Sequence, residues 1–114
     1  MSLTDIQREI AEEEKKYFEN YIYYAKKIKE ISESILGEVK VYVFGSVVDG
    51  EYTPSSDIDI LIVSKNAPSR QYEKAKIVGE ILRKIDIFAP FEIHIVTPRE
   101  FKWYKKFIRK VIKV

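Results

Sequence analysis

The residues best suited to chemistry are the pair Gly45-Ser46 and the two aspartates Asp57 and Asp59. Transfer of a phosphoryl or nucleotidyl group requires a cradle for phosphate oxygens and carboxylates that hold divalent metal ions. A glycine at a sharp turn lets the backbone approach a phosphate closely, and a serine hydroxyl adds a hydrogen-bond donor. These residue types therefore suggest phosphate binding at Gly45-Ser46 and metal binding at the aspartates.

The two aspartates lie in the segment DIDILIV, which is predicted to be a strand over residues 57–63. Side-chain alternation places both carboxylates on one face, about 6 to 7 Å apart at the backbone. Two neighbouring carboxylates repel each other, and acidic residues are depleted from strands, so the pair favours a bound cation. The alternative interpretation is a solvent-facing strand edge that carries aspartate without a function.

Composition limits the kind of metal site. The chain has no cysteine and a single histidine, His94, which excludes disulfides and multi-histidine or cysteine-based zinc sites. Oxygen ligands suit Mg²⁺, Mn²⁺ or Ca²⁺. With 114 residues, 46% of them hydrophobic, we expect one domain over residues 1–114, without linkers or repeats. No segment approaches the length of a membrane span, so we expect a cytoplasmic protein without membrane contact.

Residues 4–36 are predicted to form one long N-terminal helix, because apolar residues recur at steps of three and four and Gly37 can end it. Such a helix would span roughly 45 Å, which is longer than a domain of this size is wide. Its first turns are therefore expected to overhang or to pack on another chain, most simply in a homodimer.

The rest of the chain, residues 39–112, is predicted to alternate between strands and helices. The expected order is strand, loop, strand, helix, strand and helix, over residues 39–44, 49–56, 57–63, 68–85, 91–96 and 97–112. Pro68 fits the first turn of the middle helix, and Thr97 to Glu100 form a capping box for the last one. The fold class is therefore α/β, with a small mixed sheet of three to four strands and helices packed on one face.

The full pattern is Gly45-Ser46, ten further residues, and Asp57-x-Asp59. It resembles the signature of the DNA polymerase β-like nucleotidyltransferase superfamily, and the segment Ser56 to Ile60 is similar to its small members, the minimal nucleotidyltransferases. The resemblance extends over residues 39–104. It implies an α/β nucleotidyltransferase fold in which the glycine-serine turn holds the β- and γ-phosphates of a nucleotide.

The resemblance also implies a third metal-site carboxylate on the strand after the middle helix. Glu92 fits this place better than Asp86, which falls at a helix end. By similarity, Asp57 and Asp59 would hold a nucleotide-bound Mg²⁺ and all three carboxylates a catalytic Mg²⁺, with Mn²⁺ as an alternative. Glu92 is also a candidate for taking the proton of the acceptor hydroxyl.

Two positions depart from the family pattern. Small members often carry arginine or another polar residue just after the glycine-serine pair, and arginine before the second glycine. This chain has Val47 and Asp49 at those positions, before Gly50. The missing cations weaken the case for tight triphosphate binding, and a partner could supply one.

Three functions are consistent with these residues. The first is a metal-dependent enzyme that moves a nucleoside monophosphate, with AMP as the preferred candidate, from a nucleoside triphosphate to an acceptor hydroxyl. The resemblance then implies a separate helical partner of the HEPN type, to which the chain would be an antitoxin. The second is a catalytically weak module that neutralises such a partner by binding. The third, with RNA or DNA as acceptor, is less favoured.

Two other features are interpreted mainly as structural. His94 shares a strand face with Glu92, but a lone strand histidine more often has a structural role. The last predicted helix carries a basic face, formed by Lys102, Lys106, Arg109 and Lys113. Such a face is more often solvated than bound to nucleic acid.

Overall fold

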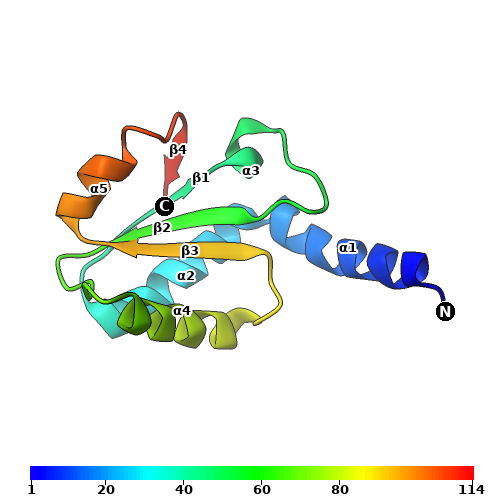
Figure 1. The fold of residues 1–114 in the computed structure, drawn as a ribbon, viewed down its shortest axis with the longest axis horizontal. Coiled ribbons are helices and arrows are strands. Elements are labelled where there is room, and N and C mark those ends of the chain that lie inside the picture. Colours follow the sequence, from blue (N-terminus) through cyan, green and yellow to red (C-terminus); the bar gives the residue numbers. More distant parts are fainter.

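The computed structural model describes all 114 residues. Five helices and four strands follow one another along the chain (Figure 1). In order, they are α1 (Leu3–Glu19), α2 (Tyr21–Leu36), β1 (Lys40–Phe44), α3 (Ser46–Asp49), β2 (Ile58–Val63), α4 (Gln71–Ile85), β3 (Phe91–Val96), α5 (Pro98–Tyr104) and β4 (Val111–Lys113). No helix combines the length and the hydropathy that a membrane span requires.

The four strands form one mixed sheet in the order β3-β2-β1-β4. β1 is antiparallel to both β2 and β4, whereas β2 and β3 are parallel. Parallel neighbours need a crossover connection, and α4 supplies it between β2 and β3. The expected α/β fold with a mixed sheet is confirmed.

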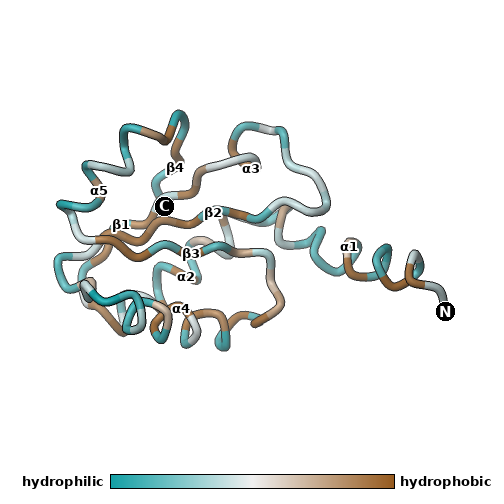
Figure 2. The backbone as a smooth tube through the Cα atoms, in the orientation of Figure 1, coloured by the Kyte–Doolittle hydropathy of each residue, from teal (hydrophilic) through white to brown (hydrophobic).

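The main core lies between one face of the sheet and the helices α2 and α4. Isoleucines at alternate positions of β2 (Ile58, Ile60 and Ile62) are fully buried there, together with Ile28 of α2 and Ile81 of α4. In Figure 2, hydrophobic colour runs along β1 and much of β2, whereas β3 alternates between hydrophobic and hydrophilic stretches. Strand alternation therefore fixes which side chains of β2 face the opposite side, and Asp59 is among them.

The opposite face of the sheet carries a second, smaller cluster. Leu61, Val63 and Val96 pack there against α5, mainly through Phe101 and Tyr104. The expectation of helices on one face thus describes α2 and α4, while α5 covers part of the other face. The rest of that face, toward β1 and the start of β2, remains open to the site described below.

The long N-terminal helix is interrupted, so the expectation of a single helix over residues 4–36 is wrong. Asn20 separates α1 from α2 with φ −121° and ψ 31°. Its backbone N–H and its side-chain amide both donate to the carbonyl of Lys16, at 3.1 and 2.8 Å. An asparagine side chain competes for backbone groups in this way and favours helix ends. The N-terminal part of α1, which precedes Asn20 in the chain, projects away from the sheet (Figure 1).

The C-terminal segment also differs from the expectation. The helix predicted over residues 97–112 ends at Tyr104, a turn follows, and Val111–Lys113 form β4. The predicted capping box is confirmed, since Thr97 accepts from the N–H of Glu100 and Glu100 accepts from the N–H of Thr97. Pairing with the edge of β1 explains the change, because the β-branched Val111 and Ile112 favour a strand.

The other boundaries lie close to the expected ones. β3 spans the predicted residues 91–96, and β1 begins one residue later than expected. α4 begins at Gln71, so Pro68 precedes the helix instead of opening it.

Candidate functional site

The site is built around the turn that follows β1. Gly45 has φ 86° and ψ −160°, a backbone conformation that L side chains rarely adopt. Its carbonyl accepts hydrogen bonds from the N–H groups of Val48 and Asp49, both at 3.1 Å. The predicted glycine-serine turn is therefore present, and Ser46 opens the single helical turn α3, which ends at Gly50.

Gly45 lies directly against Asp59. The antiparallel register pairs Asp59 with Phe44, the residue before the glycine. A Cβ atom on Gly45 would collide with a carboxylate oxygen of Asp59 and would lie 3.2 Å from its Cγ. A glycine is thus required here both by its backbone angles and by the nearby carboxylate, and this contact joins the turn to β2.

Asp59, Glu92 and His94 form a compact group of potential metal ligands. The parallel register of β2 and β3 pairs Asp59 with Glu92 and Leu61 with His94. One ligand atom from each of the three side chains lies within 4.8 Å of the others. The Nε2 atom of His94 is 3.6 Å from Glu92 Oε1 and 3.9 Å from Asp59 Oδ1.

This donor set fits a divalent cation. Two carboxylates suit Mg²⁺ and Mn²⁺, and an imidazole is accepted more readily by Mn²⁺ than by Mg²⁺. The side chains of Asp59 and His94 are only 23% and 27% exposed, whereas that of Glu92 is 54% exposed. An ion here would therefore be held against the sheet by Asp59 and would remain open to a substrate beside Glu92.

Asp57 is not part of this group. The strand begins at Ile58, whose N–H donates to the carbonyl of Pro90 at 2.7 Å, so Asp57 lies just outside the sheet in an exposed position. The expectation that Asp57 belongs to the strand is therefore wrong by one residue. Burial, followed by the negative charge of Asp57, raises the pKa of Glu14 on α1. Asp57 thus lies outside the cluster, and its charge acts on Glu14 of α1.

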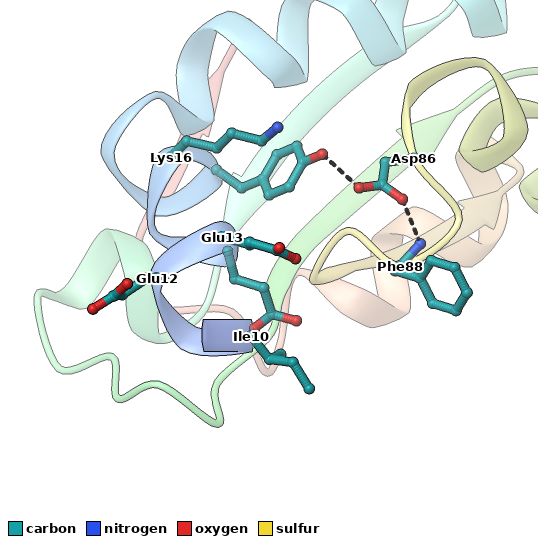
Figure 3. A pocket seen from close by; sticks show the side chains of 8 residues that line it. Ile10, Glu12, Glu13, Lys16, Asp86 and Phe88 are labelled. Carbon is teal, nitrogen blue, oxygen red and sulfur yellow. Dashed lines mark hydrogen bonds between the residues drawn. The ribbon is translucent and has the colours of Figure 1, made fainter. Parts of the chain in front are cut away.

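Asp86, the alternative to Glu92, lies elsewhere. It accepts hydrogen bonds from the Tyr17 hydroxyl and from the N–H of Phe88, both at 2.9 Å (Figure 3). The backbone N–H of Phe88, followed by the Tyr17 hydroxyl, lowers the pKa of Asp86. These bonds indicate a structural role for Asp86, which stabilises the connection between α4 and β3 and links it to α1.

A large hollow adjoins Asp86 and not the cluster of Asp59, Glu92 and His94. It has a volume of about 760 Å³ and lies between α1 and the connection after α4 (Figure 3). Its charged lining is mainly acidic: Glu12, Glu13, Glu14 and Asp86, with Lys16 as the single cation. Such a lining repels phosphate, so size alone does not locate a nucleotide site here.

Val47 and Asp49, the two positions that depart from the pattern described above, have different surroundings. Val47 is 6% exposed and belongs to the main core, so its side chain points away from the turn surface. Asp49 is exposed and lines a small hollow together with Gly45. A cation at position 47 would have to leave the core, whereas the carboxylate at position 49 adds negative charge beside the turn.

His94 was interpreted from the sequence mainly as a structural residue, and the structure places it beside Asp59 and Glu92. Its ring lies between Phe44 and Tyr104, with centroid distances of 5.9 and 6.0 Å, and its Nε2 atom faces the two carboxylates. The available signal was its position two residues after Glu92, on the same strand face. That signal could not show which neighbouring strand would complete the group.

Comparison with known proteins finds related domains. Residues 25–114 match the family model described as a nucleotidyltransferase domain. A crystal structure of a candidate nucleotidyltransferase is 41% identical, with a TM-score of 0.63, and the match covers 78% of this chain and 95% of that one. A second candidate nucleotidyltransferase, from Sulfolobus solfataricus, is 26% identical with a TM-score of 0.55, covering 83% and 82%. No curated protein gives a significant match.

Proposed function

Because the chain belongs to the nucleotidyltransferase family, we propose that it moves a nucleoside monophosphate, preferably AMP from ATP, to an acceptor hydroxyl. The acceptor oxygen forms a bond to the α-phosphorus while the bond to the leaving pyrophosphate breaks. The observation that carries this proposal is the convergence of Asp59, Glu92 and His94 beside the Gly45-Ser46 turn.

Five residues have a proposed role. Gly45 and Ser46 bind the β- and γ-phosphates, and Asp57 together with Asp59 holds the nucleotide-bound metal. Asp59 and Glu92, together with Asp57, hold the catalytic metal, and Glu92 takes the proton of the acceptor. Two Mg²⁺ ions, or Mn²⁺, would supply charge neutralisation for the attacking and leaving oxygens.

We further propose that the acceptor belongs to another macromolecule. The family match spans residues 25–114, and the minimal nucleotidyltransferases that the chain resembles commonly pair with a separate helical protein. A helical partner of the HEPN type, with this chain as its antitoxin in the cytoplasm, fits this organisation. The acceptor would then be a side chain of that partner, with tyrosine as the preferred candidate.

The second candidate function is a binding module of the same fold with weak or no catalysis. The buried Val47 and the exposed Asp49 favour it, because neither position offers a cation to a triphosphate. Such a module would neutralise its partner by covering a surface of it.

The test is incubation with α-³²P-labelled ATP, Mg²⁺ and a HEPN-type helical protein, chosen as one whose reading frame adjoins that of this chain. The enzyme proposal predicts Mg²⁺-dependent labelling of the partner that is lost in Asp59→Asn. A matched control, Glu38→Gln, removes an exposed carboxylate at the other end of β1 and should retain transfer. A tight complex without any label transfer would instead support the binding module.

A further inference from the structure

A small hollow opens on the exposed side of Gly45. Its volume is about 260 Å³, and Gly45 and Asp49 line it together with Arg109 and Lys110 from the turn before β4. The remaining lining residues are Phe44, Phe107 and Ile108. Since a water molecule occupies about 30 Å³ in the liquid, the hollow is large enough for a phosphate group.

The sheet register fixes this arrangement. β4 pairs with β1 so that Val111 lies opposite Phe44, the residue before Gly45. Lys110 and Arg109 directly precede Val111, so the pairing of β4 brings them to the same end of β1 as the glycine turn. The carbonyl of Val41 also accepts from the N–H of Val114 at 3.0 Å, which extends the pairing to the last residue.

The charges of this hollow are suited to an anion. Arg109 and Lys110 are exposed, and neither takes part in any of the four ion pairs of the structure. Their two positive charges exceed the single negative charge of Asp49. An arginine can bind two phosphate oxygens at once, and a lysine supplies a compact charge.

We propose that Arg109 and Lys110 bind the polyphosphate chain of the nucleotide substrate. They replace, from the C-terminal turn, the cations that positions 47 and 49 lack. This inference rests on the proposed nucleotidyltransferase function and extends it to a second phosphate-binding element. The strand β4, which the sequence did not predict, is what brings this element to the site.

The test measures binding of tripolyphosphate and of ATP, each with Mg²⁺, by isothermal titration calorimetry. The variant Arg109→Gln/Lys110→Gln is compared with Lys105→Gln/Lys106→Gln, which removes the same charge from residues outside the hollow. We expect the first variant to raise the Kd for both ligands ~10- to 100-fold, because each charge-assisted bond contributes about a factor of ten. The control should change the Kd less than threefold, and Asp49→Asn should lower it.

Binding of Mn²⁺ without phosphate should be the same in both double variants, which shows that the carboxylate cluster is intact. Equal weakening in the two double variants, or an unchanged Kd in the first, would overturn the inference. So would weakened RNA binding with unchanged tripolyphosphate binding, or no tripolyphosphate binding by the unaltered protein. If tripolyphosphate binds through Arg109 and Lys110 but no acceptor is ever labelled, the inference stands and the proposed catalysis falls.

Discussion

Two glycines allow the role of Gly45 to be tested at the scale of the residue. Gly45 and Gly50 both have positive φ, at 86° and 75°, but only Gly45 lacks room for a side chain, because Asp59 occupies it. We expect Gly50→Ala to cost about 1–2 kcal/mol of stability through backbone strain alone. Gly45→Ala should cost more and should also weaken Mn²⁺ binding, since Asp59 must move. Thermal unfolding and calorimetric Mn²⁺ titration compare the two variants. Equal Mn²⁺ affinity of Gly45→Ala and Gly50→Ala would contradict the proposed effect of the contact between Gly45 and Asp59.

The choice between Glu92 and Asp86 gives a second residue-scale prediction. We expect Glu92→Gln to reduce nucleotidyl transfer at least ~100-fold, because it removes a metal ligand and a candidate general base. Asp86→Asn should retain transfer and lose about 1 kcal/mol of stability, because its bond to Tyr17 is weakened. Rates from labelled ATP and free energies from denaturant unfolding separate the two. A large loss of transfer in Asp86→Asn alone would reverse the assignment.

Side-chain alternation could predict that Asp59, Glu92 and His94 lie on definite strand faces, because it depends only on local geometry. Their convergence depends on the parallel register of β2 with β3, which no local pattern encodes. The position of Asp57 depends on where β2 begins, and such boundaries are set by long-range bonds such as that from Ile58 to Pro90.

At the scale of elements, α1 is attached to the domain by the buried Tyr17, which gives a pH-dependent prediction. Burial, followed by the hydrogen bond to Asp86, raises the pKa of Tyr17 from 10.0 to about 12. A phenol with a raised pKa contributes stability that is complete below about pH 10 and is lost as the pH rises toward 12. We expect the free energy of unfolding of the unaltered protein to fall by ~2 kcal/mol more than that of Tyr17→Phe over this interval. Denaturant titrations at a series of pH values measure this free energy. An equal fall with pH in the unaltered protein and in Tyr17→Phe would contradict the prediction.

A second contact of α1 supports the loop that leads to Asp57. Phe18 stacks on Tyr52 with a centroid distance of 4.8 Å and an interplanar angle of 8°. We expect Tyr52→Ala to release this loop, so that amides of residues 50–57 exchange faster and transfer falls about tenfold. Tyr52→Phe keeps the stacked ring and should behave like the unaltered protein. Unchanged exchange in Tyr52→Ala would show that the stack does not order the loop.

The elements that the sequence predicted well are those with strong local patterns, such as β3 and the capping box before α5. The interruption at Asn20 was not predicted, because the apolar spacing continues through it from α1 into α2. β4 was not predicted either, because residues 105–112 also fit helical spacing. In that segment, pairing with the free edge of β1 outweighs the local preference.

At the scale of the whole molecule, α1 is an addition to the family domain. The family match begins at residue 25, and α1 carries a row of apolar side chains, Leu3, Ile6 and Ile10, that are 70%, 41% and 50% exposed. We expect this row to join two copies of the chain, because a second α1 can cover it. Sedimentation should show a concentration-dependent dimer that becomes a monomer in Ile6→Lys/Ile10→Lys. Tyr72→Lys, at an exposed site on α4, is the control; a monomer at every concentration would contradict the prediction.

The most direct test of the account is whether nucleotide binding requires a divalent metal held by the carboxylate cluster. The measurement is calorimetric titration with a non-hydrolysable ATP analogue, in Mn²⁺ and in excess EDTA, for the unaltered protein and for Asp59→Asn. The account predicts binding in Mn²⁺, little or none in EDTA, and an affinity reduced at least ~10-fold in Asp59→Asn. Equal affinity with and without metal, or in the protein and its variant, would contradict it.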